Sequence, residues 1–500
     1  TGGDSSGSSG SSSSDAAMGR VTIFAIDDCP FCKKAKSLLT KEGVEYYEIN
    51  LSDYPYKRPD MLKAAKNLTV PQIFFNDHHV GGAAELEALM KEGKFDELWA
   101  KTQQGPDPVD PLLQRPDTPP APRPKPSPRK DETMTIGEGK LTPVEAVRLM
   151  EGKLNRSFKG SQLVDLIAEA FKVSREDALA AGKQFQELGL IKPVDQVSEV
   201  RDDTTWYWLT RRKHPLMLNT FRAWKDRVDD PMVTVETLKK WLGRIVSRHR
   251  NDDGLVDYVA VKEDPEFDEF DEASCELQGI DLGKMDTNTK LAFLINVYNM
   301  AITHAFAKVG APKSGIQRSK FFPRVGYKIG GHAYSFDHIE GGLLRGNRPG
   351  AGPLARSGPI PLNDPRLGFV LKESEVDNRI HFALNCGAKS CPPVKKFSAE
   401  AVKDELDIVA KAFFMQPENF RVEGRTVHIT KILGWYSRDF GKTKEEVVLA
   451  LEPWISTKDF DTIRHLVETK TLKVEYNHYD WSNDALRTVS PALGGGCTIV

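Results

Sequence analysis

The stretch that decides the fold of the N-terminal part of the chain reads Phe24-Ala-Ile-Asp-Asp-Cys29-Pro-Phe-Cys32-Lys-Lys34. A hydrophobic segment ends there, two cysteines follow three positions apart, and an amphipathic helix is expected to begin. This pattern places Cys29 exposed at a helix N-terminus and Cys32 one turn behind it. Two thiols in that arrangement predict thiol–disulfide exchange.

The segments around this stretch alternate between strand and helix patterns. Together they predict a βαβ unit, followed by a hairpin and a final helix. The expected elements are strands over residues 21–26 and 44–50, helices over residues 33–42 and 60–66, a hairpin that turns at Asn76-Asp77, and a last helix through Trp99.

Residues 21–99 resemble the glutaredoxin family through Cys29-Pro-Phe-Cys32, Thr69-Val70-Pro71 and Gly81-Gly82, which stand in that family's order and spacing. The resemblance implies a thioredoxin-like α/β domain in which Cys29 is the nucleophile and Cys32 resolves the mixed disulfide. It also implies that Pro71 is cis and that glutathione is the co-substrate. The implied glutathione-binding residues are Thr69, Val70, Pro71, Gly81 and Gly82.

A thiolate at Cys29 can be stabilised by the amides and the dipole of the helix N-terminus. Two departures from the family pattern bear on this thiolate and on glutathione: Ile26 replaces a lysine, and Ala84-Glu85 replace an acidic pair. We therefore expect the pKa of Cys29 to be less depressed than is usual in the family. Nearby lysines offer compensating charge, namely Lys33, Lys34 and Lys36.

Other interpretations of the two cysteines stay open. They can be two buried thiols, or half of a zinc site completed by His78 and His79. A zinc site needs two further ligands close by, and these histidines are the local candidates. We expect no metal.

The chain has 500 residues, of which 39% are hydrophobic and 28% are charged, and its net charge is -2. This composition is typical of a globular protein. This length suggests about three or four domains. The charge balance does not favour a nucleic-acid partner. Six cysteines are too few for a disulfide-stapled secreted protein, so a reducing, cytoplasmic setting is expected. The apolar segment 291–307 is interrupted by polar residues and is expected to be a buried helix.

The next module covers residues 141–212 and follows a proline-rich linker. It resembles the DEP domain, a winged helix, through Phe158-Lys-Gly160-Ser-Gln-Leu-Val164 and through Ala178-Leu-Ala-Ala-Gly182. The resemblance implies docking to a membrane or to a signalling partner. Helices are expected near residues 143–151, 161–171 and 174–188, with a β-wing that ends at residue 209.

The third module resembles the family called domain of unknown function 547, through motifs that include Ile329-Gly-Gly-His332 and Asn385-Cys386-Gly-Ala-Lys-Ser-Cys391. A strand is expected over residues 381–384. Cys386 as nucleophile, His332 as base and Asp337 as orienting carboxylate would suit a cysteine hydrolase. A Cys386/Cys391 redox pair, half of a metal site, substrate binding and purely structural roles stay open.

The chain ends in Gly494-Gly-Gly-Cys497-Thr-Ile-Val500, which has the cysteine position of a C-a-a-X prenylation box. A single lipid anchors weakly, so a docking module would be the second signal for peripheral membrane association.

The predicted architecture is a thioredoxin-like α/β domain, a winged-helix DEP domain and a larger helix-rich α+β domain. The leading functional hypothesis is a glutathione-dependent oxidoreductase that acts on protein disulfides or glutathionylated proteins. A signalling or interaction protein with a regulatory redox head, and a cysteine hydrolase, are the alternatives. The predicted boundaries are 1–20 for a Gly/Ser-rich leader, 21–102, 103–140 for the linker, 141–212, 213–482 and 483–500 for the tail.

Overall fold

The computed structural model describes residues 19–26, 29–51, 53–67, 69–105, 110–114, 133–213, 216–350 and 358–489. The chain divides into two compact units, Thr1–Arg123 and Pro124–Val500. Most of the proline-rich linker, all of the leader before Gly19 and the C-a-a-X cysteine Cys497 lie outside the described residues.

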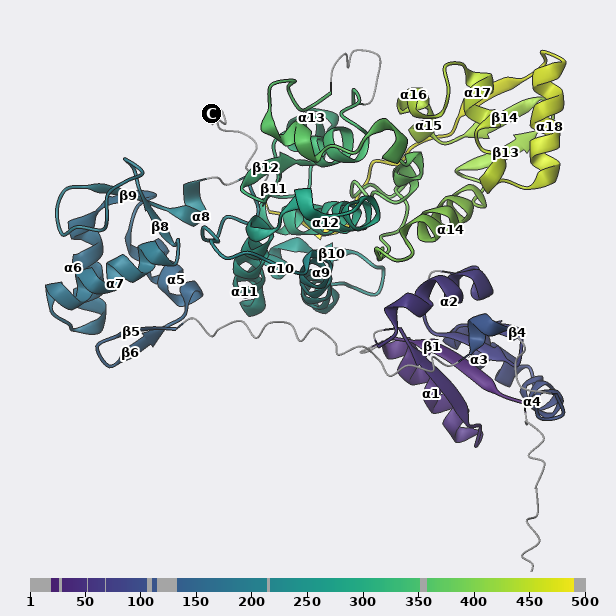
Figure 1. Ribbon diagram of the computed structural model, residues 1–500, viewed down its shortest axis with the longest axis horizontal. Helices are drawn as coiled ribbons and strands as arrows, with labels where there is room; N and C mark the ends of the chain where they lie inside the picture. Colours follow the sequence, from purple (N-terminus) through teal and green to yellow (C-terminus); the bar gives the residue numbers. More distant parts are fainter. Residues whose placement is uncertain are drawn as a thin grey trace, which may run out of the picture. The chain divides into compact units, whose positions relative to one another are not determined.

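The first unit is built on a four-stranded sheet in the order β2-β1-β3-β4. Strands β1 and β2 are parallel and are connected through α1, whereas β3 is antiparallel to both β1 and β4. This is the expected βαβ unit followed by a hairpin, and it is a thioredoxin-like arrangement (Figure 1). The elements are β1 (Val21–Ala25), α1 (Pro30–Lys41), β2 (Tyr46–Asn50), α2 (Arg58–Ala65), β3 (Gln72–Phe75), β4 (His78–Gly81), α3 (Ala83–Lys91) and α4 (Phe95–Gln103).

Burial explains why these segments pair. All five residues of β1 and all four of β3 are buried, and Ala35 and Leu39 of α1 pack against them. The structure differs from expectation at the end, where the last helix is two helices. Gly93 between them has φ +69°, a left-handed conformation that ends α3 at little steric cost.

The second unit begins with a small helical module. A hairpin of β5 and β6 precedes three helices, and a three-stranded sheet has the order β7-β9-β8. The three expected helices and the strand ending at residue 209 are confirmed, and membership of the DEP family stays a prediction. The elements are β5 (Met134–Ile136), β6 (Gly139–Leu141), α5 (Pro143–Lys153), β7 (Ser157–Lys159), α6 (Gly160–Phe171), α7 (Arg175–Glu187), β8 (Ile191–Pro193), β9 (Trp206–Leu209) and α8 (Thr210–Lys213).

The remainder of the second unit is helix-rich and surrounds α12 (Thr287–Lys308), a long helix that packs against α9, α10 and α14 (Figure 1). The expected buried helix over residues 291–307 is confirmed. Within the described ranges, no helix is long and apolar enough to span a membrane. The other elements are α9 (Pro231–Arg248), β10 (Val256–Asp257), α10 (Tyr258–Glu263), α11 (Pro265–Ala273), α13 (Gly315–Phe321), β11 (Gly326–Ile329), β12 (His332–Ser335), α14 (Val402–Phe414), β13 (Phe420–Glu423), β14 (Thr426–Ile429), α15 (Lys431–Trp435), α16 (Ser437–Phe440), α17 (Lys444–Leu449), α18 (Thr457–Glu468), β15 (Lys473–Tyr476) and β16 (Ala485–Arg487).

The strand expected over residues 381–384 is wrong. Residues 378–382 form a short 3₁₀ helix, whose first turn is capped by the Asp377 side chain accepting from the Arg379 amide at 3.1 Å. Phe382 is buried and stacks on Phe413 of α14. A short apolar run has the same appearance in a buried strand and in a buried helical turn, so periodicity did not separate them.

Candidate active site

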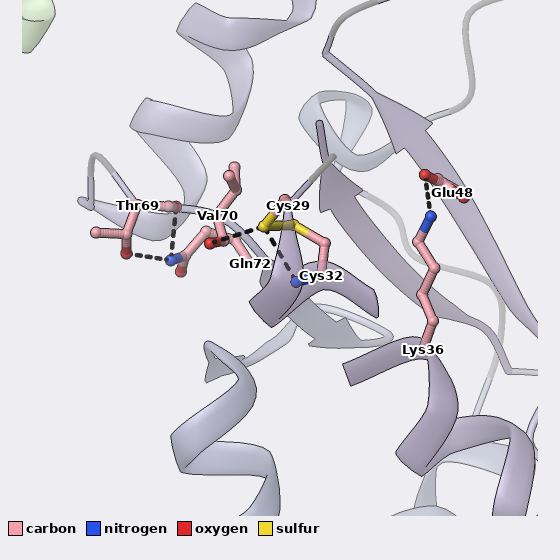
Figure 2. Close-up of a disulfide and its surroundings, with 7 residues drawn as sticks. All are labelled: Cys29, Cys32, Lys36, Glu48, Thr69, Val70 and Gln72. Atoms are coloured by element: carbon pink, nitrogen blue, oxygen red, sulfur yellow. Dashed lines mark hydrogen bonds and ion pairs between the residues drawn. A yellow bond between two sulfur atoms is a disulfide. The ribbon is translucent and has the colours of Figure 1, made fainter. Parts of the chain in front are cut away.

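Cys29 and Cys32 are joined by a disulfide at the start of α1, as Figure 2 shows. Cys29 is the N-cap residue, and its Sγ accepts a hydrogen bond from the Cys32 amide at 3.1 Å. Pro30 occupies the first turn, where its missing N–H leaves no helical hydrogen bond unmade. The sulfur at position 29 is therefore placed where helix amides and the helix dipole stabilise a thiolate in the reduced state.

The expectation that Cys29 is exposed is wrong. Cys29 is 8% exposed and Cys32 is 1% exposed, because both pack with Ala25, Ile26 and Val70. The exposed group at this site is Phe31, at 66%, which lies between the two cysteines in sequence.

The loop before β3 lies against the disulfide. The Val70 carbonyl oxygen is 3.9 Å from Cys29 Sγ, and the Val70–Pro71 peptide bond is cis, as expected. Gln72 holds this loop from behind, because its Nε2 donates to the Thr69 carbonyl at 2.9 Å and to Thr69 Oγ1 at 3.2 Å (Figure 2). Its Oε1 is 2.7 Å from Nε2 of His79, so three residues fix one loop beside the sulfurs.

Gly81 and Gly82 connect β4 to α3 and lie next to the same loop. Gly81 has φ +114°, which an L side chain rarely adopts, and a Cβ at Gly82 would stand 3.4 Å from the Pro71 carbonyl oxygen. Glu85 accepts from the Gly82 amide at 2.9 Å. The predicted glutathione-binding residues from Thr69 to Gly82 thus belong to two segments that meet beside Cys29.

The lysines proposed as compensating charges are mostly engaged elsewhere. Lys34 pairs with Glu87 at 2.6 Å. Lys36 pairs with Glu48 at 2.5 Å, and Figure 2 shows this pair away from the sulfurs. Lys33 forms no ion pair with a described residue. Asp27 and Asp28 lie outside the described residues. The predicted, weakly depressed pKa of Cys29 stays a prediction.

His79, one of the two histidines of the zinc alternative, is partly buried and contacts strand β3. Burial lowers its pKa, as does the charge of His78, and its ring stacks on Phe74 at 4.7 Å. In the part of the chain that the structure describes, no group of three or more His, Cys, Asp or Glu side chains is arranged to hold a metal ion. His79 instead belongs to the hydrogen-bond network of Gln72.

In the second unit, the structure brings together two of the four residues predicted for a further site. Cys386 Sγ and Cys391 Sγ are 3.0 Å apart. His332 contacts Phe369 and Tyr334 by ring packing, and it lines a hollow with Lys225 and Arg227 rather than with a cysteine. The contacts of the described residues therefore give the cysteines no histidine base.

Asp337 is held near a second carboxylate. The pKa of Asp337 is raised to about 6, mainly because the carboxyl is buried and to a smaller extent because of the charge of Glu340. Glu340 accepts hydrogen bonds from Tyr436 at 2.5 Å and from Tyr298 at 3.2 Å, so it is fixed in place beside Asp337.

Asp337→Asn is expected to stabilise the second unit at pH 7 by about 1–3 kcal/mol and to have little effect below pH about 4. The folded-state pKa lies above the unfolded one, so the ionised carboxylate destabilises the fold as pH rises from about 4 through 6. Urea unfolding at pH 4 and pH 7 measures the difference. Asp364→Asn is the matched control with the opposite sign, because hydrogen bonding to Arg366 lowers the pKa of Asp364 to about 2. Equal effects of Asp337→Asn at both pH values would contradict the assignment.

Sequence reasoning missed Gln72 in the first unit and Tyr479 beside the second pair of cysteines. The signal for Gln72 was available, since an amide that follows the Thr-Val-Pro motif inside a buried strand needs partners. Tyr479 lies 88 positions after Cys391 and reaches its Sγ at 3.2 Å. A local sequence pattern does not predict a contact between residues that are 88 positions apart.

Two family models match parts of the chain: residues 21–80 match Glutaredoxin, and residues 282–414 match Protein of unknown function, DUF547. Glutaredoxin 3 of Escherichia coli K12 is 40% identical over 81 residues, which are 16% of this chain and 98% of that relative. Glutaredoxin of Pseudomonas aeruginosa is 41% identical over 81 residues, 16% of this chain and 96% of that relative. The solution structure of glutaredoxin from Brucella melitensis is 38% identical, covers 18% of this chain and 97% of its own, and has a TM-score of 0.17.

Proposed function

We propose, from the premise that the N-terminal domain of this chain belongs to the glutaredoxin family, that the protein is a glutathione-dependent thiol–disulfide oxidoreductase. The observation that carries the proposal is the position of Cys29 Sγ, which accepts the Cys32 amide at the α1 N-terminus and lies 3.9 Å from the Val70 carbonyl. A sulfur there is activated by helix amides and faces backbone that an extended peptide can meet.

Each residue has a defined part in the exchange. The Cys29 thiolate attacks the glutathione sulfur of a glutathionylated protein, and the protein thiolate leaves and takes up a proton. A second glutathione thiolate then attacks the Cys29–glutathione disulfide, which regenerates Cys29 and releases oxidised glutathione. With a protein disulfide as substrate, Cys32 attacks the Cys29–protein disulfide instead, and two glutathione molecules reduce the resulting Cys29–Cys32 disulfide.

Glutathione would lie along the loop of Thr69, Val70 and Pro71 and across Gly81 and Gly82. The Gln72 network supports this position, because Thr69 is bonded to Gln72 before any ligand binds and does not have to be ordered on binding. The absence of side chains at the two glycines lets a peptide backbone come close. Phe31, exposed next to the sulfurs, is the apolar contact for the client protein.

The other modules would localise this activity. In this proposal residues 141–212 are a DEP-type docking module for a membrane or a signalling partner, and prenylation of Cys497 adds a weak lipid anchor to a cytoplasmic protein. The aromatic pair Trp206 and Trp208 supports docking, because Lys159 and Arg156 stand over these rings on one surface of the module. A cysteine hydrolase in the third domain stays a hypothesis, without a histidine contact to support it.

The test is glutathione-dependent turnover by the full chain of two substrates, a small glutathionylated peptide and a protein disulfide, coupled to recycling of oxidised glutathione. The proposal is supported if the protein turns over both substrates and if this turnover requires Cys29. If the reduced, folded protein turned over neither substrate, the result would favour the signalling alternative, in which the glutaredoxin-like domain (residues 21–102) is regulatory.

A further inference from the structure

A second pair of cysteines, outside the glutaredoxin domain, is arranged for redox chemistry. Cys386 and Cys391 stand at the two ends of one loop, with their sulfurs 3.0 Å apart. A disulfide bond needs about 2.05 Å, so the two sulfurs are within about 1 Å of bonding. Both residues are partly exposed although their thiols are largely covered, whereas the third described free cysteine, Cys275, is fully buried.

Hydrogen-bond donors lie closer to the sulfur of Cys391 than to that of Cys386, since the Tyr479 hydroxyl is 3.8 Å from Cys386 Sγ. Cys391 Sγ accepts from the Cys386 amide at 3.2 Å and lies 3.2 Å from the Tyr479 hydroxyl. The hydrogen bond with the Cys386 thiol lowers the pKa of Cys391, burial opposes this, and Tyr479 adds to the lowering. The same contact raises the pKa of Cys386. One sulfur is thus set up as the thiolate and its neighbour as the thiol, which is the asymmetry that thiol exchange uses.

The loop is held in this shape from two sides. On one side, Asn299 of α12 accepts from the Asn385 amide at 2.9 Å and donates to the Ala383 carbonyl at 3.0 Å. On the other side, the segment of Tyr479 is bound to the loop, because the Asp480 amide donates to Ser390 Oγ at 2.8 Å. Between the cysteines, Gly387 has φ +82° and lies against Phe306, where a Cβ would stand 2.4 Å from the ring. The sulfurs and the hydroxyl are therefore preorganised.

We propose that Cys386 and Cys391 form a second dithiol–disulfide centre, in which Cys391 is the attacking sulfur, Cys386 is the resolving sulfur and Tyr479 stabilises the thiolate. Its substrate class is a disulfide that reaches the partly exposed loop. The aromatic group of Trp435, Tyr479 and Trp481, with ring centroids 4.6–5.2 Å apart, lies beside the sulfurs and provides an apolar surface for that substrate. This inference does not depend on activity of Cys29.

The Cys391 thiolate attacks one sulfur of the substrate disulfide, a mixed disulfide forms, and the other substrate sulfur leaves as a thiolate that takes up a proton. Cys386 loses its proton and attacks Cys391 Sγ, so that the Cys386–Cys391 disulfide forms and the second substrate thiol leaves. Two electrons pass from the protein dithiol to the substrate. Two molecules of a low-molecular-weight thiol, such as glutathione, reduce the pair again.

The experiment uses the full chain with Cys29→Ser, Cys32→Ser and Cys497→Ser, which keeps the second pair and Cys275. The protein is equilibrated in mixtures of reduced and oxidised glutathione, quenched in acid, unfolded and labelled with a maleimide, and its intact mass is measured. We expect three labels under reducing conditions and one label under oxidising conditions, with no glutathione attached. Adding Cys386→Ser should trap one glutathione on Cys391 under oxidising conditions.

Alkylation of the reduced, folded protein tests the roles of the two sulfurs. At pH 6, Cys391 should react faster than Cys386, and Tyr479→Phe should slow it by about 3–10-fold. Tyr476→Phe is the matched control, since it removes a hydroxyl from the neighbouring strand β15 and should leave the rate unchanged. Three labels at every glutathione ratio, glutathione attached to both cysteines, or faster alkylation of Cys386 would each overturn the proposal.

Discussion

In a chain that also carries Cys386→Ser and Cys391→Ser, Cys29→Ser is expected to reduce glutathione-dependent turnover of both substrates by at least about 10³-fold, equivalent to about 4 kcal/mol of transition-state stabilisation. A serine hydroxyl at the α1 N-terminus accepts the same amide but is not ionised near neutral pH, so it cannot attack a disulfide. In the same background, Cys32→Ser should have a different effect. It should keep turnover of the glutathionylated peptide, which needs Cys29 and glutathione, and lose most reduction of the protein disulfide, which needs a resolving thiol.

Rate measurements, alkylation and one control variant test whether Cys29 is the nucleophile. Steady-state rates with each substrate separate the two routes, and alkylation of the reduced chain against pH assigns the lower pKa to one sulfur. Cys497→Ser removes a thiol far along the sequence and serves as the control, with rates equal to those of the unmodified chain. A low-pKa group at Cys32, or full turnover in Cys29→Ser, would contradict the assignment of Cys29 as nucleophile.

Asp271→Asn is expected to destabilise the second unit by about 3–5 kcal/mol, because the variant leaves buried cations without their counter-charge. Asp271 has no exposed side-chain surface, and its carboxylate accepts from Lys308 at 2.6 and 2.8 Å. Nη2 of Arg211, a residue of α8, lies 3.4 Å from Oδ2 of Asp271. Burial alone would raise the pKa of Asp271, but Lys308, His304 and Arg211 outweigh it and hold the pKa well below its usual range.

The sign of the pH dependence follows from this depressed pKa. The carboxylate contributes its stability above the unfolded-state pKa, near 4, and loses it as pH falls toward the lower folded-state pKa. The difference between the unmodified chain and Asp271→Asn should therefore be full at pH 7 and smaller at pH 3. Urea unfolding followed by tryptophan fluorescence reports mainly on the second unit, since Trp99 is the one tryptophan in the first.

A surface pair supplies the control for this variant. Asp461 pairs with Arg464 at 2.7 Å, but both side chains are more than half exposed. Asp461→Asn should change stability by less than about 1 kcal/mol, because solvent screens an exposed pair. If the two aspartate variants had similar effects, the buried cluster would not hold the helical module of Arg211 to the domain of Lys308.

Much of the first site was predictable because its parts are close in sequence. The order of strands and helices around Cys29 and Cys32 follows from periodicity, and the N-cap position of Cys29 follows from its spacing before an amphipathic helix. The cis bond at Pro71 and the glycine pair came from the family resemblance. The burial of Cys29 was not predictable, since the covering residue, Val70, comes from a loop 41 positions later.

What the amino-acid sequence by itself determined is the chemistry of Cys29 and Cys32, because a residue, its helix cap and its partner lie within one turn. What only the tertiary structure decided is which residues that are distant in the sequence come into contact. It separates His332 from the sulfurs, turns residues 378–382 into a helix, and brings Tyr479 to Cys391. The physical reason is that such contacts arise from packing around α12 and from pairing of remote segments, and these depend on the whole chain rather than on local periodicity.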